Sequence, residues 1–323
     1  MKAILWTKYG PPEVLQLREV EKPTPKDNEV LIRIYATTVT KGDCEQRSLK
    51  FHPMFSIPMR MYVGLIRPKR ITILGQELAG EVEAVGKGVK RFGPGDQVFG
   101  TAGFSFGTYA EYKCLPEDGL VAAKPANMTY DEAAAVPLGG LEALYYLRKG
   151  NTRSGQEILI NGAGGSIGTL AIQLAKYFGA EVTAVDSTAK LDMLRSIGAD
   201  RVIDYTQEDF TRSGETYDAI FDVVGKSPFS RSIRSLKQNG CYLLANPGLS
   251  QMVRGPWTSR TGSKKVISGR ANPTTGDLVY LRELIEAEKI KPVVDRSYPL
   301  EQIIEAHRYV EMGGKKGTVV ITV

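Results

Sequence analysis

The clearest hydrophobic pattern in the chain lies between Glu157 and Asp186, where its period changes twice. The apolar run Ile158–Asn161 has the length of a buried strand. After a glycine-rich turn, apolar residues recur every three or four positions, as on one face of a helix: Ile167, Leu170, Ala171, Leu174, Ala175 and Phe178. A second apolar run, Val182–Val185, ends at Asp186. The order strand, glycine turn, helix and strand predicts a βαβ unit.

Residues 1–122 show a different pattern, because short alternating segments follow one another with turn residues between them. Turns are indicated at Gly10–Pro12, Pro23–Asn28, Gly86–Gly88 and Gly93–Asp96. The strands expected between them are Ala3–Trp6, Val14–Val20, Val30–Tyr35, Glu81–Val85 and Gln97–Gly100. Few helical patterns occur in this part, so we expect a small antiparallel barrel.

From about Lys124, strands and helices alternate. Thr129 and Glu132 form a capping-box pattern at the start of an alanine-rich helix. Further helices are expected at Gly168–Phe178, Ala189–Ile197, Phe229–Gln238, Asp277–Lys289 and Leu300–Met312. Strands are expected at Ile158–Asn161, Val182–Val185, Val202–Asp204, Ala219–Val224, Cys241–Ala245 and Lys265–Ser268. This alternation predicts an α/β fold with a doubly wound parallel sheet, and the last strand, Thr318–Val323, is expected to return to the barrel.

The turn of the βαβ unit has the composition of a dinucleotide site: Gly162, Ala163, Gly164, Gly165, Ser166, Ile167 and Gly168. Its glycines permit a tight turn and a close approach of the backbone to a pyrophosphate, and the helix that follows directs its positive end at it. Asp186 ends the second strand, where a carboxylate accepts hydrogen bonds from the adenosine ribose. We therefore expect NAD(H) or NADP(H) as cofactor.

The same turn also fits a second enzyme class. Gly164, Ser166 and Gly168 match the G-x-S-x-G pattern of the hydrolase nucleophile elbow, which likewise lies between a strand and a helix. Asp222 and His307 follow in the order that such a triad requires. Against this, His307 shares a helical face with apolar residues, and no oxyanion segment of the HGGG type precedes the turn. A serine hydrolase that uses Ser166 remains an alternative.

Size and composition exclude several other classes. The 323 residues suffice for two domains, and the net charge of +6 is spread over short clusters without a basic stripe, so no nucleic-acid partner is expected. The three cysteines form no CxxC pair, and no long apolar run or signal-peptide pattern occurs. We expect a cytoplasmic protein without a membrane partner.

Several phrases together resemble the medium-chain dehydrogenase/reductase superfamily, in its zinc-free, quinone-oxidoreductase-like branch. They are Gly75–Val82, Gly93–Gly100, Ala133–Pro137, Gly162–Gly168, Leu194–Tyr205 and Gly317–Val320. The resemblance covers essentially the whole chain. It implies a GroES-like catalytic domain over residues 1–123 and 273–323, a Rossmann domain over residues 124–272, and a cleft between them for nicotinamide and substrate.

The resemblance also bears on zinc. Zinc alcohol dehydrogenases carry a Gly-His-Glu phrase and a cysteine in the preceding segment, whereas this chain has Gln76 and, near the cysteine position, Thr40. A catalytic zinc needs three protein ligands, and the candidate set in this chain is Cys44, His52 and Glu77. Without such a Lewis acid, reduction of a conjugated acceptor is expected rather than oxidation of an alcohol.

Cofactor choice depends on the residues after the second strand. A carboxylate at Asp186 pairs with ribose hydroxyls and repels a 2′-phosphate, which favours NADH slightly. Ser187, Thr188 and Lys190 follow directly, and zinc-free relatives that use NADPH often have a similar segment after an uncharged residue. Dual use therefore stays open.

The resemblance assigns further residues to the site. Thr40, Asp43 and Tyr62 are the catalytic candidates, with Tyr62 donating a hydrogen bond to the acceptor oxygen; packing and capping roles are equally open for Tyr62 and Asp43. An apolar loop, Phe51–Leu65, is expected to form either a wall for a planar acceptor or part of the core. Glu142 stands where relatives often have threonine, with no role evident. Cofactor contacts are expected from Tyr205, Val224, Gly225, Asn246 and the segment Gly269 to Ala271.

Two expectations concern the surface of the second domain. Gly248–Gly262 is expected to be a mobile loop over the cofactor, and Lys264–Ser268 an edge strand that pairs with its copy in a homodimer. The sequence thus predicts an NAD(P)H-dependent oxidoreductase of quinones or α,β-unsaturated carbonyls. Besides the hydrolase, a non-catalytic NAD(P)H-binding sensor or partner protein remains the alternative.

Overall fold

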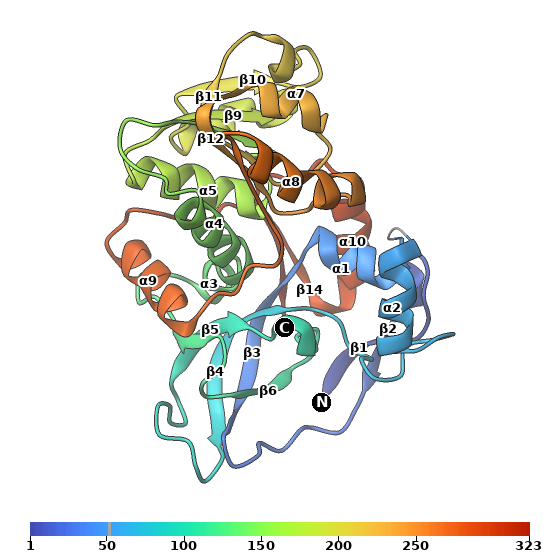
Figure 1. Ribbon diagram of the computed structural model, residues 1–323. Coiled ribbons are helices and arrows are strands. Elements are labelled where there is room, and N and C mark those ends of the chain that lie inside the picture. The colour runs from blue at the N-terminus through green and yellow to red at the C-terminus, as the bar shows by residue number, and fades with distance from the viewer. Residues whose placement is uncertain (51–52) are drawn as a thin grey trace. The chain divides into compact units, whose positions relative to one another are not determined.

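The long strand β3 (Glu29–Val39) organises the first half of the fold, because it pairs with three other strands. The computed structural model, which describes residues 1–50 and 53–323, places it in a seven-stranded sheet in the order β14-β15-β3-β4-β5-β7, with β6 also on β3 (Figure 1). The other bounds are β4 (Glu77–Val85), β5 (Gln97–Thr101), β6 (Tyr112–Pro116), β7 (Val121–Ala123), β14 (Val294–Pro299) and β15 (Thr318–Thr322). β15 pairs antiparallel with β3, so the predicted return of the last strand is confirmed.

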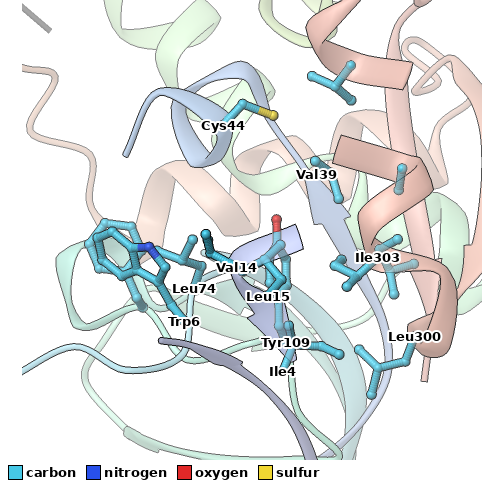
Figure 2. Packing of buried hydrophobic residues seen from close by; sticks show 14 of the residues in the cluster. Ile4, Trp6, Val14, Leu15, Val39, Cys44, Leu74, Tyr109, Leu300 and Ile303 are labelled. Atoms are coloured by element: carbon cyan, nitrogen blue, oxygen red, sulfur yellow. The ribbon is translucent and has the colours of Figure 1, made fainter. Parts of the chain in front are cut away.

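Two hydrophobic cores stabilise this part of the chain. One lies between the strands and contains Val30, Ile32, Leu78, Val98 and others that are nearly inaccessible to solvent. In the other, Trp6, Tyr109, Leu300 and Ile303 converge from separate segments (Figure 2). The elements around the second core are β1 (Lys2–Trp6), β2 (Leu15–Glu19), α1 (Lys41–Ser48), α10 (Ile303–Glu311) and the 3₁₀ turns Pro12–Val14 and Leu300–Gln302.

A buried arginine joins α1 to α10 beside this core. The Arg47 side chain is fully buried and pairs with the Glu311 carboxylate. It also donates to the Gly10 carbonyl at 3.1 Å, and one of its guanidinium nitrogens lies 2.9 Å from His307 Nδ1. A buried charge is tolerated only with such partners, and through them Arg47 ties the last turn of α1 to α10.

Six parallel strands form the second sheet, in the order β10-β9-β8-β11-β12-β13. Their bounds are β8 (Glu157–Asn161), β9 (Glu181–Asp186), β10 (Arg201–Asp204), β11 (Tyr217–Asp222), β12 (Leu236–Leu244) and β13 (Lys265–Ser268). The helices of this part are α4 (Pro137–Lys149), α5 (Ser166–Tyr177), α6 (Leu191–Ser196), α7 (Phe229–Arg234) and α8 (Leu249–Thr261). All six predicted strands are present, which confirms the doubly wound α/β fold.

The chain forms two units, one of Met1–Leu138, Thr274–Glu286 and Val293–Val323, the other of Gly139–Pro273 and Ala287–Pro292. The first also contains α2 (Pro53–Val63), α3 (Tyr130–Ala134) and α9 (Thr275–Glu286). The domain boundaries implied by the family resemblance remain a prediction. No helix among the described residues has the length and apolar character needed to cross a membrane.

Three local expectations are wrong. Residues 249–261 form α8 and not a mobile loop, since its first turn is closed by Gln251, whose side chain accepts from Gly248 N. The predicted helix Phe229–Gln238 ends at Arg234, because β12 already begins at Leu236. The expected loop at 51–65 is mostly the helix Pro53–Val63, while Phe51 and His52 lie outside the described residues.

Candidate nucleotide and substrate site

The glycine-rich turn connects β8 to α5 with little room for side chains. Gly162 has a φ of +83°, a conformation that other L-residues rarely adopt. A Cβ at Gly168 would lie 2.5 Å from the Ala163 Cα, so only glycine lets the first turn of α5 pack against the loop. The turn residues predicted for the cofactor, Gly162 through Gly168, are thus brought together by backbone geometry.

The start of α5 fits an anionic group. Its N-cap is Gly165, which has no side chain to bond the amides of the first turn. A helix start of this kind directs its first-turn amides and the positive end of its dipole at an anionic group such as a pyrophosphate. A Cβ at Gly165 would meet only the Gly162 oxygen, at 3.8 Å, so the approach to the loop is open there. The residues present therefore fit a dinucleotide.

Asp186 is already engaged by the protein. Its Oδ2 accepts from Gly164 N at 2.7 Å and its Oδ1 from Ser187 N at 2.9 Å. Lys190 Nζ lies 3.1 Å from Oδ1, and the two side chains are only 10% and 8% exposed. The lysine stem crosses the glycine turn, because a Cβ at Gly164 would be 2.4 Å from Lys190 Cδ. The negative charge expected to select NADH is thus neutralised by Lys190, one of the residues that the sequence grouped with a possible NADPH-binding segment.

The other predicted nucleotide residues lie at the ends of neighbouring strands. Asp186 and Asp204 are in register on β9 and β10, and Thr188 donates to the Asp204 carboxylate. Tyr205, which directly follows β10, is 61% exposed. Ser187, Thr188 and Tyr205 therefore gather at one edge of the sheet.

The ends of β11 and β12 also meet as predicted. A Cβ at Gly225 would lie 1.9 Å from the backbone carbonyl oxygen of Asn246, and Asn246 Nδ2 donates to the Val223 carbonyl at 2.8 Å. Val224, which lies between Val223 and Gly225 in the chain, is partly exposed. Gly269 and Ala271 follow β13 in the same unit.

Sequence reasoning missed a polar network beneath these turns. Asn161 Nδ2 donates to Asp222 Oδ1 at 3.0 Å and to Ser227 Oγ at 2.9 Å, and Tyr242 donates to Asp222 Oδ2 at 2.9 Å. Gly225 N also donates to Asp222. The signal was available, since Asn161 and Asp222 are polar residues at the ends of apolar strands.

This network contradicts the hydrolase alternative. Neither Asp222 oxygen bonds a histidine among the described residues. His307 lies fully buried, with Nδ1 3.3 Å from Cys44 Sγ. Burial, and then the charge of Arg47, lower the pKa of His307 to about 3. It is therefore neutral and shielded at neutral pH, and serves the core rather than Ser166.

The catalytic candidates of the first unit occupy separate elements. Thr40 and Asp43 form a capping box at the start of α1, and Asp43 is 1% exposed. Burial raises the pKa of Asp43. Tyr62 lies near the end of α2, partly exposed, with the Arg70 guanidinium 4.3 Å from its ring centroid. No hydrogen bond joins Tyr62 to the capping box in the described part of the chain.

The apolar residues of the 53–63 helix and the turn after it form an exposed surface. Ile57, Met61, Leu65 and Ile66 are all well exposed, whereas Val63 is buried in the core. Met59 is partly buried against that core. Both interpretations of this segment therefore hold for different residues, and the side chains of Met54 and Phe55 lie outside the described ones.

Glu77 is a buried carboxyl with a defined structural task. It accepts a hydrogen bond from Thr38 and another, at 2.7 Å, from Leu138 N in the first turn of the 137–149 helix. Burial raises its pKa to about 7, although both donors act in the opposite direction. Among the other metal candidates, burial raises the Cys44 pKa, and His52 is not described. The described residues contain no group of three or more metal-ligating side chains.

Glu142 is the second carboxyl whose pKa burial raises to about 7. It lies on α4 in the nucleotide-binding unit, partly buried, and the charge of Arg270 acts on it in the opposite direction.

Comparison with known proteins agrees with this arrangement. The alcohol dehydrogenase GroES-like domain family matches residues 26–125, and the family described as zinc-binding dehydrogenase matches residues 197–321. The 2-methylene-furan-3-one reductase of Solanum lycopersicum is 35% identical over 99% of this chain and 79% of its own length. The chain belongs to the medium-chain dehydrogenase/reductase superfamily, in its quinone-oxidoreductase-like branch.

Two further relatives support this placement. The NADPH-dependent alkenal/one oxidoreductase of Arabidopsis thaliana chloroplasts is 33% identical over 99% of the chain and 79% of its own length. The quinone oxidoreductase structure from Coxiella burnetii has a TM-score of 0.88 at 30% identity and covers 100% of this chain and 99% of that one. The chain is therefore an oxidoreductase of this superfamily with a nicotinamide cofactor.

Glu77 generates a testable pH dependence. Because burial favours the neutral acid in the folded state, the stabilisation that its protonation contributes is complete below the unfolded pKa of about 4.3 and is lost as pH rises through about 7. The loss amounts to roughly 4 kcal/mol. We expect the melting temperature of the wild type to fall relative to Glu77→Gln between pH 5 and pH 8.5. Glu19→Gln, at an exposed glutamate, serves as control; identical pH dependence in wild type and Glu77→Gln would refute the assignment.

Proposed function

We propose that the chain is a zinc-independent reductase that transfers a hydride from NADPH or NADH to a quinone or an α,β-unsaturated carbonyl compound. The observation that carries the proposal is the anion-binding turn at the start of α5 in a chain with Gln76 and Thr40 at the family's zinc-ligand positions. The tomato and Arabidopsis relatives, whose names describe reduction of such acceptors, support it.

Two groups of residues bind the parts of the cofactor that lie away from the nicotinamide. Gly162–Gly168 and the first turn of α5 hold the pyrophosphate, and Ser187, Thr188, Lys190 and Tyr205 surround the adenosine end. A bound nicotinamide supplies the hydride. A conjugated acceptor is already activated toward hydride addition, so the protein has to position it, exclude water and provide a proton.

Turnover tests this proposal directly. Protein treated with EDTA is expected to consume NADPH or NADH with quinones and enones, and to leave simple saturated ketones unchanged, since these need stronger activation of the carbonyl. The absorbance of the reduced nicotinamide is followed. Cofactor binding without turnover of any acceptor would favour the sensor alternative, and activity that depends on added zinc would overturn the metal assignment.

For the cofactor we propose use of both NADPH and NADH. Lys190 offsets the charge of Asp186, so a 2′-phosphate meets no isolated carboxylate and gains a nearby cation. The slight preference for NADH that Asp186 predicts in the sequence remains untested.

The variant Lys190→Gln separates these effects. It removes the cation and leaves the Asp186 charge uncompensated, so kcat/KM for NADPH relative to NADH is expected to fall about 10- to 100-fold. Lys176→Gln is the control, because Lys176 pairs with Asp200 on the surface of the same unit. An unchanged cofactor ratio in Lys190→Gln would exclude a role for this lysine in recognising the phosphate.

We also propose a homodimer through β13. This strand ends the sheet, and no further strand pairs with it in the described chain. Val253 and Trp257, one turn apart on α8, are 75% and 70% exposed, and Trp257 lines a groove with Phe229 and Lys264. An unprotected strand edge beside exposed apolar side chains is typical of an interface.

Light scattering during size exclusion is expected to give twice the chain mass for the wild type. The double variant Val253→Glu/Trp257→Glu is expected to be monomeric, while Met312→Glu, which alters an equally exposed apolar residue of the first unit, stays dimeric. A monomeric wild type at micromolar concentration would exclude this interface.

A further inference from the structure

One face of α4 contacts both the start of α5 and the segment that follows β13. Gly139, Glu142 and Tyr146 follow at spacings of three and four residues, so they share this face. A Cβ at Gly139 would lie 2.7 Å from the Ser166 carbonyl oxygen, which shows that the face begins against the first residue of α5.

Tyr146 fixes the other side of Glu142. Its ring lies against Phe221 of β11, with 5.2 Å between ring centroids. Its fully buried side chain donates a hydrogen bond to the Gly269 carbonyl, directly after β13. The α4 face therefore contacts the glycine-rich turn at one point and the carboxyl end of β13 at another.

Glu142 lies between these two points. It is about 4.5 Å from Gly139 and about 6 Å from Tyr146 along the helix axis, as the rise per residue requires. In doubly wound sheets, ligands bind outside the carboxyl ends of the strands. Glu142 is the one carboxyl residue of α4, and it lies on the helix face that contacts this edge.

The surroundings of Glu142 make it a usable acid near neutrality. Burial raises its pKa to about 7. The charged and titratable groups that interact with it are Arg270, which stabilises the carboxylate, and the phenol of Tyr146. Because Glu142 is only partly buried, its carboxyl group can exchange protons with solvent.

We propose that Glu142 is the general acid of the reaction and donates the proton that completes reduction of the acceptor. The inference rests on the proposed function. Hydride addition to the β-carbon of an enone moves the π electrons to oxygen and gives an enolate. The Glu142 O–H bond then breaks, a C–H bond forms at the α-carbon, and the carboxylate beside Arg270 takes up a proton from water. For a quinone the same proton goes to oxygen.

The alternative is a purely structural role, in which Glu142 forms an ion pair with Arg270 that stabilises the fold. The two explanations differ in the protonation state of the resting protein, because a structural ion pair requires a carboxylate. They also differ in the variants: Glu142→Asp keeps an acid, whereas Glu142→Gln keeps the size and loses the proton. Glu181→Gln, at an exposed glutamate of the same unit, is the matched control.

The first measurement uses the cofactor-free protein. Infrared difference spectra of protein with ¹³C-labelled glutamate are recorded against Glu142→Gln as a function of pH. We expect the carbonyl band of a protonated carboxyl group that is absent from the variant and titrates near pH 7. A Glu142 that is fully ionised at pH 6 would overturn the proposal, whatever the enzyme does in turnover.

The second measurement is the pH profile of kcat with an enone. The wild-type kcat is expected to fall as pH rises through about 7, because the acid form is lost. Glu142→Gln should lower kcat about 100-fold and abolish this pH dependence, with the Kd for NADPH within threefold of wild type. Glu142→Asp should recover part of the rate. Unchanged kcat in Glu142→Gln, or equal losses in cofactor binding and rate, would overturn the assignment.

The two failures can be told apart. If the wild type reduces no acceptor, the proposed function fails, while the infrared titration still reports on the acid. If the wild type turns over and Glu142→Gln keeps its rate and pH profile, the proposed function stands and the role of Glu142 falls.

Discussion

Parallel pairing of β8 with β9 and β11 brings the carboxyl ends of these strands to one edge of the sheet. The residues predicted to bind the nucleotide depend on this constraint, since each lies at or shortly after the end of a strand. The glycine turn can enter α5 at this edge only because Gly168 permits contact with Ala163. A register shift in β8 would displace the turn from Asp186 and from the Asn161–Asp222 network together.

The fold could be predicted from the sequence because its signals are local. The apolar strands, the glycine turn and the capping box at Thr129 each occupy a few consecutive residues, and all reappear in the structure. The failures involve competition between neighbouring elements. β12 begins at Leu236 inside an expected helix, and α8 forms in a Ser/Gly/Arg-rich segment because Gln251 closes its first turn.

The site was predictable only as far as backbone geometry decides it. Strand order determines which residues surround the glycine-rich turn. Whether a charged side chain there is unpaired depends on rotamers and on side chains far away in the sequence. From the sequence, Asp186 was expected to be available to a ribose. In the structure its carboxylate pairs with Lys190, whose side chain lies over Gly164. Glu77 and Glu142 likewise look ordinary in the sequence, and only burial, which a single chain does not display, raises their pKa values to about 7.

The burial of the cysteines has a consequence for a protein that meets electrophiles. Quinones and enones add to thiolates, so an enzyme that concentrates them risks alkylating itself. Burial raises the pKa of Cys44 well above its ordinary range and the pKa values of Cys114 and Cys241 to about 11. All three are therefore thiols at neutral pH, and the nucleophilic form is scarce. The cysteines of this protein are therefore expected to react slowly with Michael acceptors.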